Sequence, residues 1–330
     1  MSVLLSILDL ADVGPGENVP DRLRSSVELA QHAERWGYRR IWYAEHHNMP
    51  TIASAATSVL IAHVAAHTRT IRLGSGGVML PNHSPLVIAE QFGTLESLHP
   101  GRIDLGLGRA PGTDQQTFRA LRRHPAAAER FPDDVLELQG YLRGEPLVEG
   151  VRATPGHGTD VPLYILGSSL FGAQLAAQLG LPYAFASHFA PDALQAAVAA
   201  YRSGFRPSAQ LERPHVIAGV NVIAADARED AEAQLLIAKR RRAKRLFGRG
   251  RSYTDEELDL ILDSPSAAPV LQMMRYTAVG TVDEVSAYLD RFAVHADADE
   301  LILASSATDQ PKRLRTFELV AQARGLADAA

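Results

Sequence analysis

The chain contains no cysteine among its 330 residues. Disulfide bonds, thiolate metal sites and a cysteine nucleophile are therefore excluded. A hydrophobic core can form without disulfide bonds or thiolate metal sites, because 46% of the residues are hydrophobic and 22% are charged, as in ordinary globular proteins. The missing cysteine says little about compartment, since it suits reducing and oxidising surroundings alike.

The sequence also lacks any long apolar run. No segment approaches the roughly 20 apolar residues that are needed to span a bilayer. The start, MSVLLSILDLADVG, has no basic leader and is interrupted by Asp9 and Asp12, so it predicts a buried strand rather than a signal peptide. We therefore expect a cytoplasmic protein with no membrane partner. A formal net charge of -5 argues against nucleic acid as a partner.

Strand patterns alternate with helical patterns along the chain. Eight strands are predicted, and they start near these residues: Val3, Ile41, Ile71, Ile103, Leu163, Tyr183, Val216 and Leu301. This alternation indicates an α/β fold with a parallel sheet, and eight units over 330 residues favour a closed (β/α)8 TIM barrel. We expect one domain over 1–330. Segments 110–132 and 248–278 fit no barrel repeat, so they are candidate insertions or lids over the C-terminal mouth.

Polar residues gather where the predicted strands end. The groups at these ends are Glu45-His46-His47, Gly76-Gly77, Gly108-Arg109, Gly167-Ser168-Ser169 and Ser187-His188. In a TIM barrel the active site lies at the C-terminal ends of the strands. These groups are therefore the candidate functional residues.

Arg109 and the serines Ser168 and Ser169 predict an anion site. A guanidinium matches a phosphate bidentately, and hydroxyls with free N–H groups at a helix start also bind anions. The alternatives are a surface arginine and ordinary N-capping by a serine. The run Gly106–Gly112 resembles a dinucleotide fingerprint, but its spacing, G-x-G-x-x-x-G, is wrong and no clean helix follows.

Two adjacent histidines, His46 and His47, invite a metal interpretation. Side chains of neighbouring residues on an extended chain point to opposite sides, so they would not normally share an ion. His63 and His67 are four residues apart, but HVAAH lacks the glutamate of a zinc protease motif. We therefore predict no metal. One histidine of the pair is expected to face the mouth as an acid, a base or a hydrogen-bond donor.

The run KRRRAKRLFGRGR, residues 239–251, is strongly basic. A solvated helix end is the first interpretation, because cations suit the C-terminal end of the helix dipole. A subunit contact or the capture of anionic ligands comes second. Nucleic-acid binding comes last because the whole chain is acidic.

Three stretches resemble the bacterial-luciferase-like flavin-dependent monooxygenases. They are IWYAEHHNMPTIASAATSVLIAHVAAHT, IRLGSGGVMLPNHSPLVIAEQFGTLESLHPGRIDLGLGRAPG and PLYILGSSLFGAQLAAQLGLPYAFASHFAP, within which AEHH, LPNHSPL and GRIDLGLGR are the specific motifs. The resemblance covers nearly the whole chain and is strongest to the uncharacterised luciferase-like oxidoreductase branch. It implies a (β/α)8 barrel, a homodimer, and FMN that a separate flavin reductase supplies in reduced form.

The resemblance also implies roles for residues. His46 matches the catalytic histidine beside the flavin, and Gly76 and Gly77 match a pair joined by a non-prolyl cis peptide under the flavin ring. Arg109 matches the phosphate-binding arginine. The other residues implied to bind the cofactor are Glu45, Ser168 and Ser169.

The chain departs from luciferase itself at two points. It lacks that enzyme's reactive pocket cysteine, and Gly167 stands where luciferase has a glutamate. Light emission from a long-chain aldehyde is therefore not expected. The leading hypothesis is an FMN-dependent monooxygenase that uses O2 on a small organic substrate. The alternatives are hydride transfer with the deazaflavin F420 or a flavin, and a non-catalytic FMN-binding protein.

Overall fold

The computed structural model describes residues 3–14, 16–110, 115–248 and 251–326. The strands are β1 (Leu4–Asp9), β2 (Arg40–Tyr43), β3 (Arg72–Met79), β4 (Ile103–Gly108), β5 (Leu163–Gly167), β6 (Tyr183–Phe185), β7 (Val216–Ala224), β8 (Thr277–Gly280) and β9 (Glu300–Ser305). The helices up to β5 are α1 (Val19–Arg35), α2 (Thr57–Ala65), η1 (Leu80–Asn82), α3 (Pro85–Leu98), α4 (Gln115–Ala120), η2 (Pro125–Arg130) and α5 (Phe131–Arg143). The later helices are α6 (Leu170–Leu179), α7 (Leu194–Gly204), α8 (Arg228–Phe247), α9 (Asp255–Leu262), η3 (Pro265–Ala267), α10 (Ala268–Met273), α11 (Val282–His295) and α12 (Gln310–Ala323).

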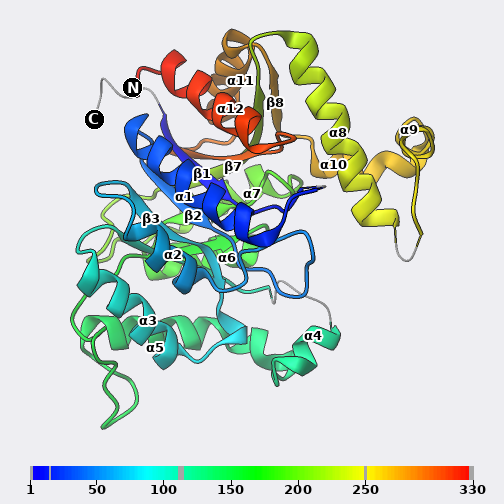
Figure 1. Ribbon diagram of the computed structural model, residues 1–330. Helices are drawn as coiled ribbons and strands as arrows, with labels where there is room; N and C mark the ends of the chain where they lie inside the picture. The colour runs from blue at the N-terminus through cyan, green and yellow to red at the C-terminus, as the bar shows by residue number, and fades with distance from the viewer. Residues whose placement is uncertain (1–2, 15, 111–114, 249–250, 327–330) are drawn as a thin grey trace.

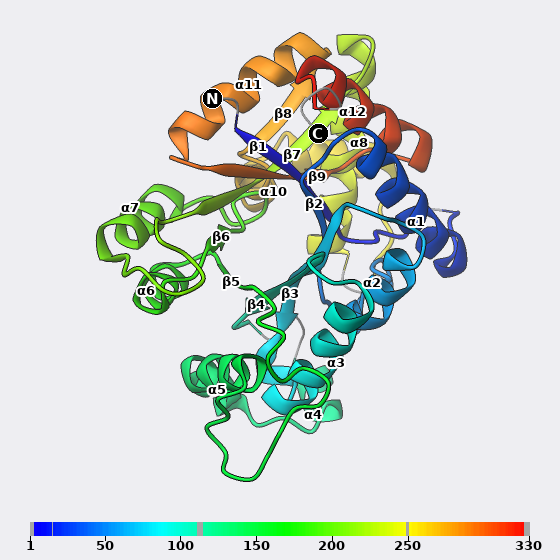
Figure 2. The same cartoon turned by 90° about the vertical axis from the view of Figure 1, so that its left-hand side faces the viewer.

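Eight of the strands found in the described ranges close into a ring, and all their pairings are parallel. The order runs from β1 through β2 to β7 in sequence, and β9 then joins β7 back to β1. The helices surround this ring (Figure 2). The predicted (β/α)8 barrel is therefore confirmed.

Strand β8 is additional to the predicted eight. It pairs with the far half of β7, from Asn221 to Ala224, and so lies outside the ring. It falls at the end of the candidate lid 248–278, whose helices α9 and α10 pack on α8 around buried Leu258 and Val270. Helix α8 extends beyond the strands and carries α9 outward (Figure 1). Of the other candidate lid, 110–132, residues 111–114 lie outside the described residues.

Apolar side chains fill two layers of the barrel. The larger cluster lies between the strands and the helices and includes Phe92, Leu105 and Tyr183. A smaller cluster lies on the other face of the strands and includes Trp42 and Ile217. Across the described part of the chain, no helix combines the length and apolarity that crossing a membrane requires.

Charged side chains are buried at the start of the strands. Arg40, the first residue of β2, donates from Nη1 to Asp104 Oδ2 at 2.7 Å and from Nε to Glu300 Oε1 at 2.9 Å. Arg72 donates from Nε to Asp104 Oδ1 at 3.0 Å, and His215 Nε2 lies 3.2 Å from Glu300 Oε2. The network therefore joins β2, β3, β4 and β9 through one set of charges.

Electrostatic pairing outweighs burial in this network. Burial alone would raise the pKa of Glu300, but Arg40, His215 and the hydroxyl of Ser6 hold that pKa down at about 2. Burial likewise opposes the charge on Arg40, yet Glu300 and Asp104 raise its pKa. Both groups are therefore charged at neutral pH, and each depends on the other because an isolated buried ion is costly.

Replacing Glu300 with Gln tests this dependence. We expect Glu300→Gln to lower the free energy of unfolding by about 3 to 5 kcal/mol, because it leaves the charge of Arg40 partly uncompensated in the interior. Urea unfolding followed by circular dichroism measures the loss. The matched control is Glu232→Gln, which breaks the exposed pair of Arg228 and Glu232 on α8 and should change stability little. Equal effects of the two variants would contradict the proposed role of the network.

Candidate functional site

Alternation along β2 decides which side chains face the barrel interior. Trp42 and Ala44 belong to the inner cluster, whereas Tyr43 belongs to the layer under the helices. Because the side chains of an extended segment alternate, Glu45 continues the outer set and His46 the inner one. The prediction that one histidine of the pair faces the mouth agrees with this arrangement.

The loop after β2 is held against the loop after β1. Asp12 and Ile52 form an antiparallel bridge, and the N–H of Ala53 donates to the carbonyl of Ala11 at 3.0 Å. The carbonyl of Ser54 accepts from the N–H of His46 at 3.4 Å. Backbone contacts thus fix the chain that carries His46, and the side chain itself is left available.

His46 and His188 each present a buried nitrogen without a hydrogen-bond partner. In both residues the atom is Nδ1. Burial lowers the pKa of His46, with Asp12 opposing the effect. Burial, aided by Arg242 and His46, lowers the pKa of His188 to about 3. Both imidazoles are therefore neutral at pH 7, when each ring has one N–H donor and one acceptor.

His188 is held from below by β7. Its carbonyl accepts from Nδ2 of Asn221 at 2.5 Å, and only 7% of the residue is exposed. The ring also lies against β7, because a Cβ atom at Gly219 would stand 2.4 Å from Nδ1 of His188. Helix α8 approaches the mouth at the loop after β1, where Arg245 pairs with Asp12 at 3.4 Å.

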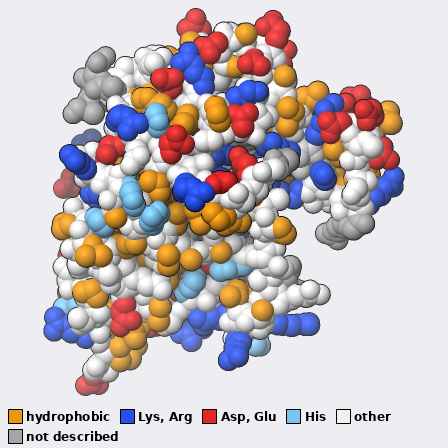
Figure 3. Space-filling model, viewed as in Figure 1, with side chains coloured by type: hydrophobic (Ala, Val, Ile, Leu, Met, Phe, Trp, Pro, Cys, Tyr) orange, Lys and Arg blue, Asp and Glu red, His pale blue; other side chains and the backbone are white. Residues whose placement is uncertain are grey.

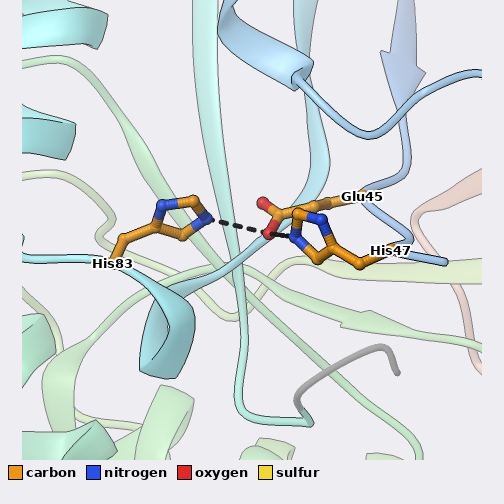
Figure 4. Close-up of side chains that lie close together, drawn as sticks. All are labelled: Glu45, His47 and His83. Carbon is orange, nitrogen blue, oxygen red and sulfur yellow. Dashed lines mark hydrogen bonds and ion pairs between the residues drawn. The ribbon is translucent and has the colours of Figure 1, made fainter. Parts of the chain in front are cut away.

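Glu45, His47 and His83 form a cluster on the outer side of the strand ends (Figure 4). His47 Nε2 and His83 Nε2 lie 2.7 Å and 2.8 Å from Glu45 Oε1, and the N–H of Met79 donates to Oε2 at 3.2 Å. Burial would raise the pKa of Glu45, but the hydrogen bonds from His47 and His83 lower it. The carboxylate thereby ties the ends of β2 and β3 together.

The same three residues could hold a metal ion. Their ligand atoms lie within 4.8 Å of one another, and two histidines with one carboxylate are a common ligand set. Sequence reasoning considered the adjacent pair His46 and His47 and the helical pair His63 and His67. It missed this cluster, because His83 lies 38 residues from Glu45. Only the loop geometry after β3 brings it close.

Gly76 and Gly77 occupy a bulge in β3 where the pairing with β4 shifts register. The peptide bond between them is cis, as the family resemblance implied. A Cβ atom at Gly76 would lie 2.8 Å from Cδ1 of Leu8, and one at Gly77 would lie 2.7 Å from the carbonyl oxygen of Gly106. No side chain fits at either position, so this part of β3 consists of backbone alone.

Arg109 reaches the first turn of α6. Its guanidinium carbon lies 4.2 Å from the ring centre of Phe171, a cation–π contact. Ser169 is the N-cap residue of α6, but its side chain makes no capping hydrogen bond. The carbonyl of Ser169 accepts from the hydroxyl of Tyr183 at 3.0 Å, which fixes the turn. An exposed cation, two serines and uncapped N–H groups therefore adjoin, as an anion site requires.

The structure divides the predicted residues into two groups. Arg109, Ser168 and Ser169 come together at the ends of β4 and β5, while His46 lies at the end of β2. Of the motif Gly106–Gly112, Pro111 and Gly112 lie outside the described residues. Sequence reasoning placed His188 at a strand end, but it had no signal that the ring is buried.

The lowered pKa of His188 predicts a pH effect on stability. A histidine that stays neutral when folded but binds a proton when unfolded destabilises the fold as pH falls below about 6.5, the unfolded value. Between pH 7.5 and 5, His188→Gln should therefore gain about 2 kcal/mol of unfolding free energy relative to the wild type. Urea unfolding at the two pH values measures this difference. Parallel losses in the two proteins would contradict it.

Comparison with known proteins agrees with this geometry. The family described as luciferase-like monooxygenase matches residues 1–298. A luciferase-like monooxygenase of Escherichia coli is 49% identical over 323 residues, which are 96% of this chain and 96% of its own. The uncharacterized protein YvbT of Bacillus subtilis is 48% identical over 321 residues, again 96% of each chain.

A solved structure extends the likeness to three dimensions. The crystal structure of apo-MsnO8 has a TM-score of 0.87 and 36% identity, and the match covers 98% of this chain and 99% of that one. The family match spans well over half of the sequence, and the motifs that carry the resemblance lie at the strand ends just described. The chain belongs to the luciferase-like monooxygenase family.

Proposed function

We propose that this protein is a monooxygenase that uses reduced FMN and O2 to oxidise a small organic substrate. The observation that carries the proposal is the position of Arg109, stacked on Phe171 beside the uncapped start of α6. A guanidinium, hydroxyl groups and helix N–H groups are the donor set that a phosphate ester takes. The residues present thus fit the phosphate of FMN.

The remaining parts of the mouth suit a flavin ring. Gly76 and Gly77 place no side chain at the end of β3, and glycines inside a strand are typical of a place where a ligand approaches the backbone closely. Arg109, Ser168 and Ser169 would hold the phosphate, and the backbone of Gly76 and Gly77 would support the ring. The carboxylate of Glu45 is already hydrogen-bonded to His47, His83 and Met79. Glu45 would therefore contribute to cofactor binding indirectly, by fixing the ends of β2 and β3.

Reduced FMN supplies the two electrons with which O2 delivers one oxygen atom to the substrate and the other to water. The protein would orient the reactants, exclude water and transfer protons. His46 is neutral at pH 7, so one ring nitrogen can donate a proton while the other accepts one. Its buried Nδ1, which has no partner, is the atom that we assign to this proton transfer.

The relatives support oxygenation more than hydride transfer. The N-acetyl-S-alkylcysteine monooxygenase of Bacillus subtilis is 33% identical over 333 residues, covering 97% of this chain and 98% of its own. The fold is also shared by a diketocamphane monooxygenase in complex with FMN and by an F420-dependent secondary alcohol dehydrogenase, at TM-scores of 0.75 and 0.70. Both are only 16% identical, so these likenesses concern the fold alone.

We propose two partners besides the substrate. A separate flavin reductase would deliver reduced FMN, as the family resemblance implies. A second copy of the chain would form a homodimer, for which α2 and α3 offer large exposed apolar side chains. These are Val59, Val87 and Leu98, which are 68%, 43% and 64% exposed.

The role of Arg109 can be tested by flavin binding alone. Arg109→Ala should weaken FMN binding about 10- to 100-fold, because it removes a charged hydrogen-bond donor from the phosphate. Fluorescence titration of FMN measures the dissociation constant. Arg213→Ala, which removes an exposed arginine from the loop before β7, is the matched control and should bind like the wild type. If the Arg109→Ala variant binds FMN as tightly as the wild type does, Arg109 does not bind the flavin phosphate.

Catalysis can be tested by oxygen uptake with chemically reduced FMN and a panel of thioethers. We expect substrate-dependent formation of an oxygenated product, and His46→Asn should lower kcat about 100-fold while FMN binding changes little. Substrate reduction or oxidation with F420 in place of FMN would favour the hydride-transfer alternative. Tight FMN binding without turnover of any panel member would favour the non-catalytic one.

A further inference from the structure

The cluster of Glu45, His47 and His83 takes no direct part in the proposed oxidation. Glu45 and His47 follow β2, and His83 follows η1 after the end of β3, so two neighbouring strand ends supply the three side chains. Figure 4 shows both imidazole rings turned toward the carboxylate. The ligand atoms, one from each side chain, lie within 4.8 Å of one another.

Both histidines approach the same oxygen atom. Nε2 of His47 lies 2.7 Å and Nε2 of His83 lies 2.8 Å from Oε1 of Glu45. The other oxygen, Oε2, accepts from the N–H of Met79 at 3.2 Å, which fixes the carboxylate relative to β3. In metal sites, the carboxylate ligands are themselves held by such outer hydrogen bonds. Oε1 and the two Nε2 atoms are thus three ligand atoms with a supported carboxylate among them.

The cluster is buried at the carboxylate and more open at the histidines. The side chain of Glu45 is 2% exposed, whereas those of His47 and His83 are 18% and 29% exposed. Within the described ranges of the chain, the ion pairs of this carboxylate are with the two histidines, which carry charge only when they are protonated. A divalent cation can therefore enter from the histidine side and supply the positive charge that a buried carboxylate requires.

Two imidazoles and one carboxylate are a ligand set for first-row divalent cations. Zinc sites with two histidines and a glutamate keep the fourth position for water. Bond lengths of about 2.0 to 2.1 Å in a tetrahedral site separate the ligand atoms by about 3.4 Å, so each histidine must withdraw from Oε1 by about 0.6 Å. Both histidines are half-buried, so small side-chain rotations provide this movement. Each imidazole then binds through Nε2 as a neutral ligand, with its proton on Nδ1.

We propose that Glu45, His47 and His83 bind one first-row divalent cation, with Zn²⁺ as the representative ion. The ion joins the end of β2 to the end of β3. Because His46 lies between two of the ligands in the chain, the ion also restrains the segment that carries it. The site is separate from the phosphate position proposed at Arg109, and it does not require that the protein be a monooxygenase.

Exposed histidines elsewhere are the competing explanation for any metal binding. Figure 3 shows histidine side chains at several places on one face of the molecule. His63 and His67 are the pair to control for, because both are exposed and their ring centres are 4.7 Å apart. Two histidines four residues apart on a helix can bind one zinc ion from the same face.

Calorimetric titration of the full-length, flavin-free protein with ZnCl₂ tests the proposal. We expect the wild type to bind one Zn²⁺ per chain. His47→Ala and His83→Ala should each weaken this binding at least about ten-fold, because the loss of an outer-shell partner alone costs about 10- to 100-fold in metal affinity. His67→Ala is the matched control and should keep the wild-type affinity. Circular dichroism of each variant checks that it is folded.

A second measurement locates the ion without any variant. Anomalous diffraction at the zinc absorption edge, from wild-type crystals grown with ZnCl₂, should place the ion among Glu45, His47 and His83. Three results would overturn the inference: a wild type that binds no Zn²⁺, an ion held by His63 and His67 instead, and folded His47→Ala and His83→Ala variants that keep the wild-type affinity.

Discussion

The barrel interior depends on the charge of Arg40. Taking a guanidinium out of water costs several kcal/mol, so it is tolerated only where acids meet it with good geometry. Asp104 and Glu300 do so from β4 and β9, and Arg72 and His215 complete the set. Because each group comes from a different strand, the charges balance only when the ring has closed in one register. The network thus favours one register for the closed barrel. Its charged side chains all lie at the start of the strands.

Much of the site is encoded locally and could be predicted from the sequence. Gly76 and Gly77 are needed because a Cβ at either position would meet a neighbouring strand or side chain. Arg109 follows directly on a buried strand, and Ser169 stands at the start of α6, so chain order alone brings both to adjacent strand ends. Alternation along β2 likewise separates His46 from its neighbours. Each of these inferences needs only a few consecutive residues and the rule that barrel sites collect where strands end.

Other features could not be predicted, because they join residues that are distant in the chain. Arg40 and Glu300 are 260 residues apart, and nothing near either one indicates its partner. His83 approaches Glu45 only because the loop after β3 turns back toward β2. Strand β8 is four residues long and pairs with an overhang of β7, so its own pattern is too short to stand out. The pairing of the arginines of α8 also depends on the fold, because Arg240 meets Asp259 and Arg245 meets Asp12 only in three dimensions.

The charged side chains at the two ends of the barrel therefore have different kinds of partner. At the start of the strands, the pKa of Arg40 is raised because acids surround it, and that charge is fully used in holding the fold. At the mouth, the exposed guanidinium of Arg109 stacks on the ring of Phe171. A guanidinium that is held by a ring keeps its hydrogen-bond donors for an anion. The phosphate position that we propose at Arg109 therefore lies apart from the charges that hold the fold together.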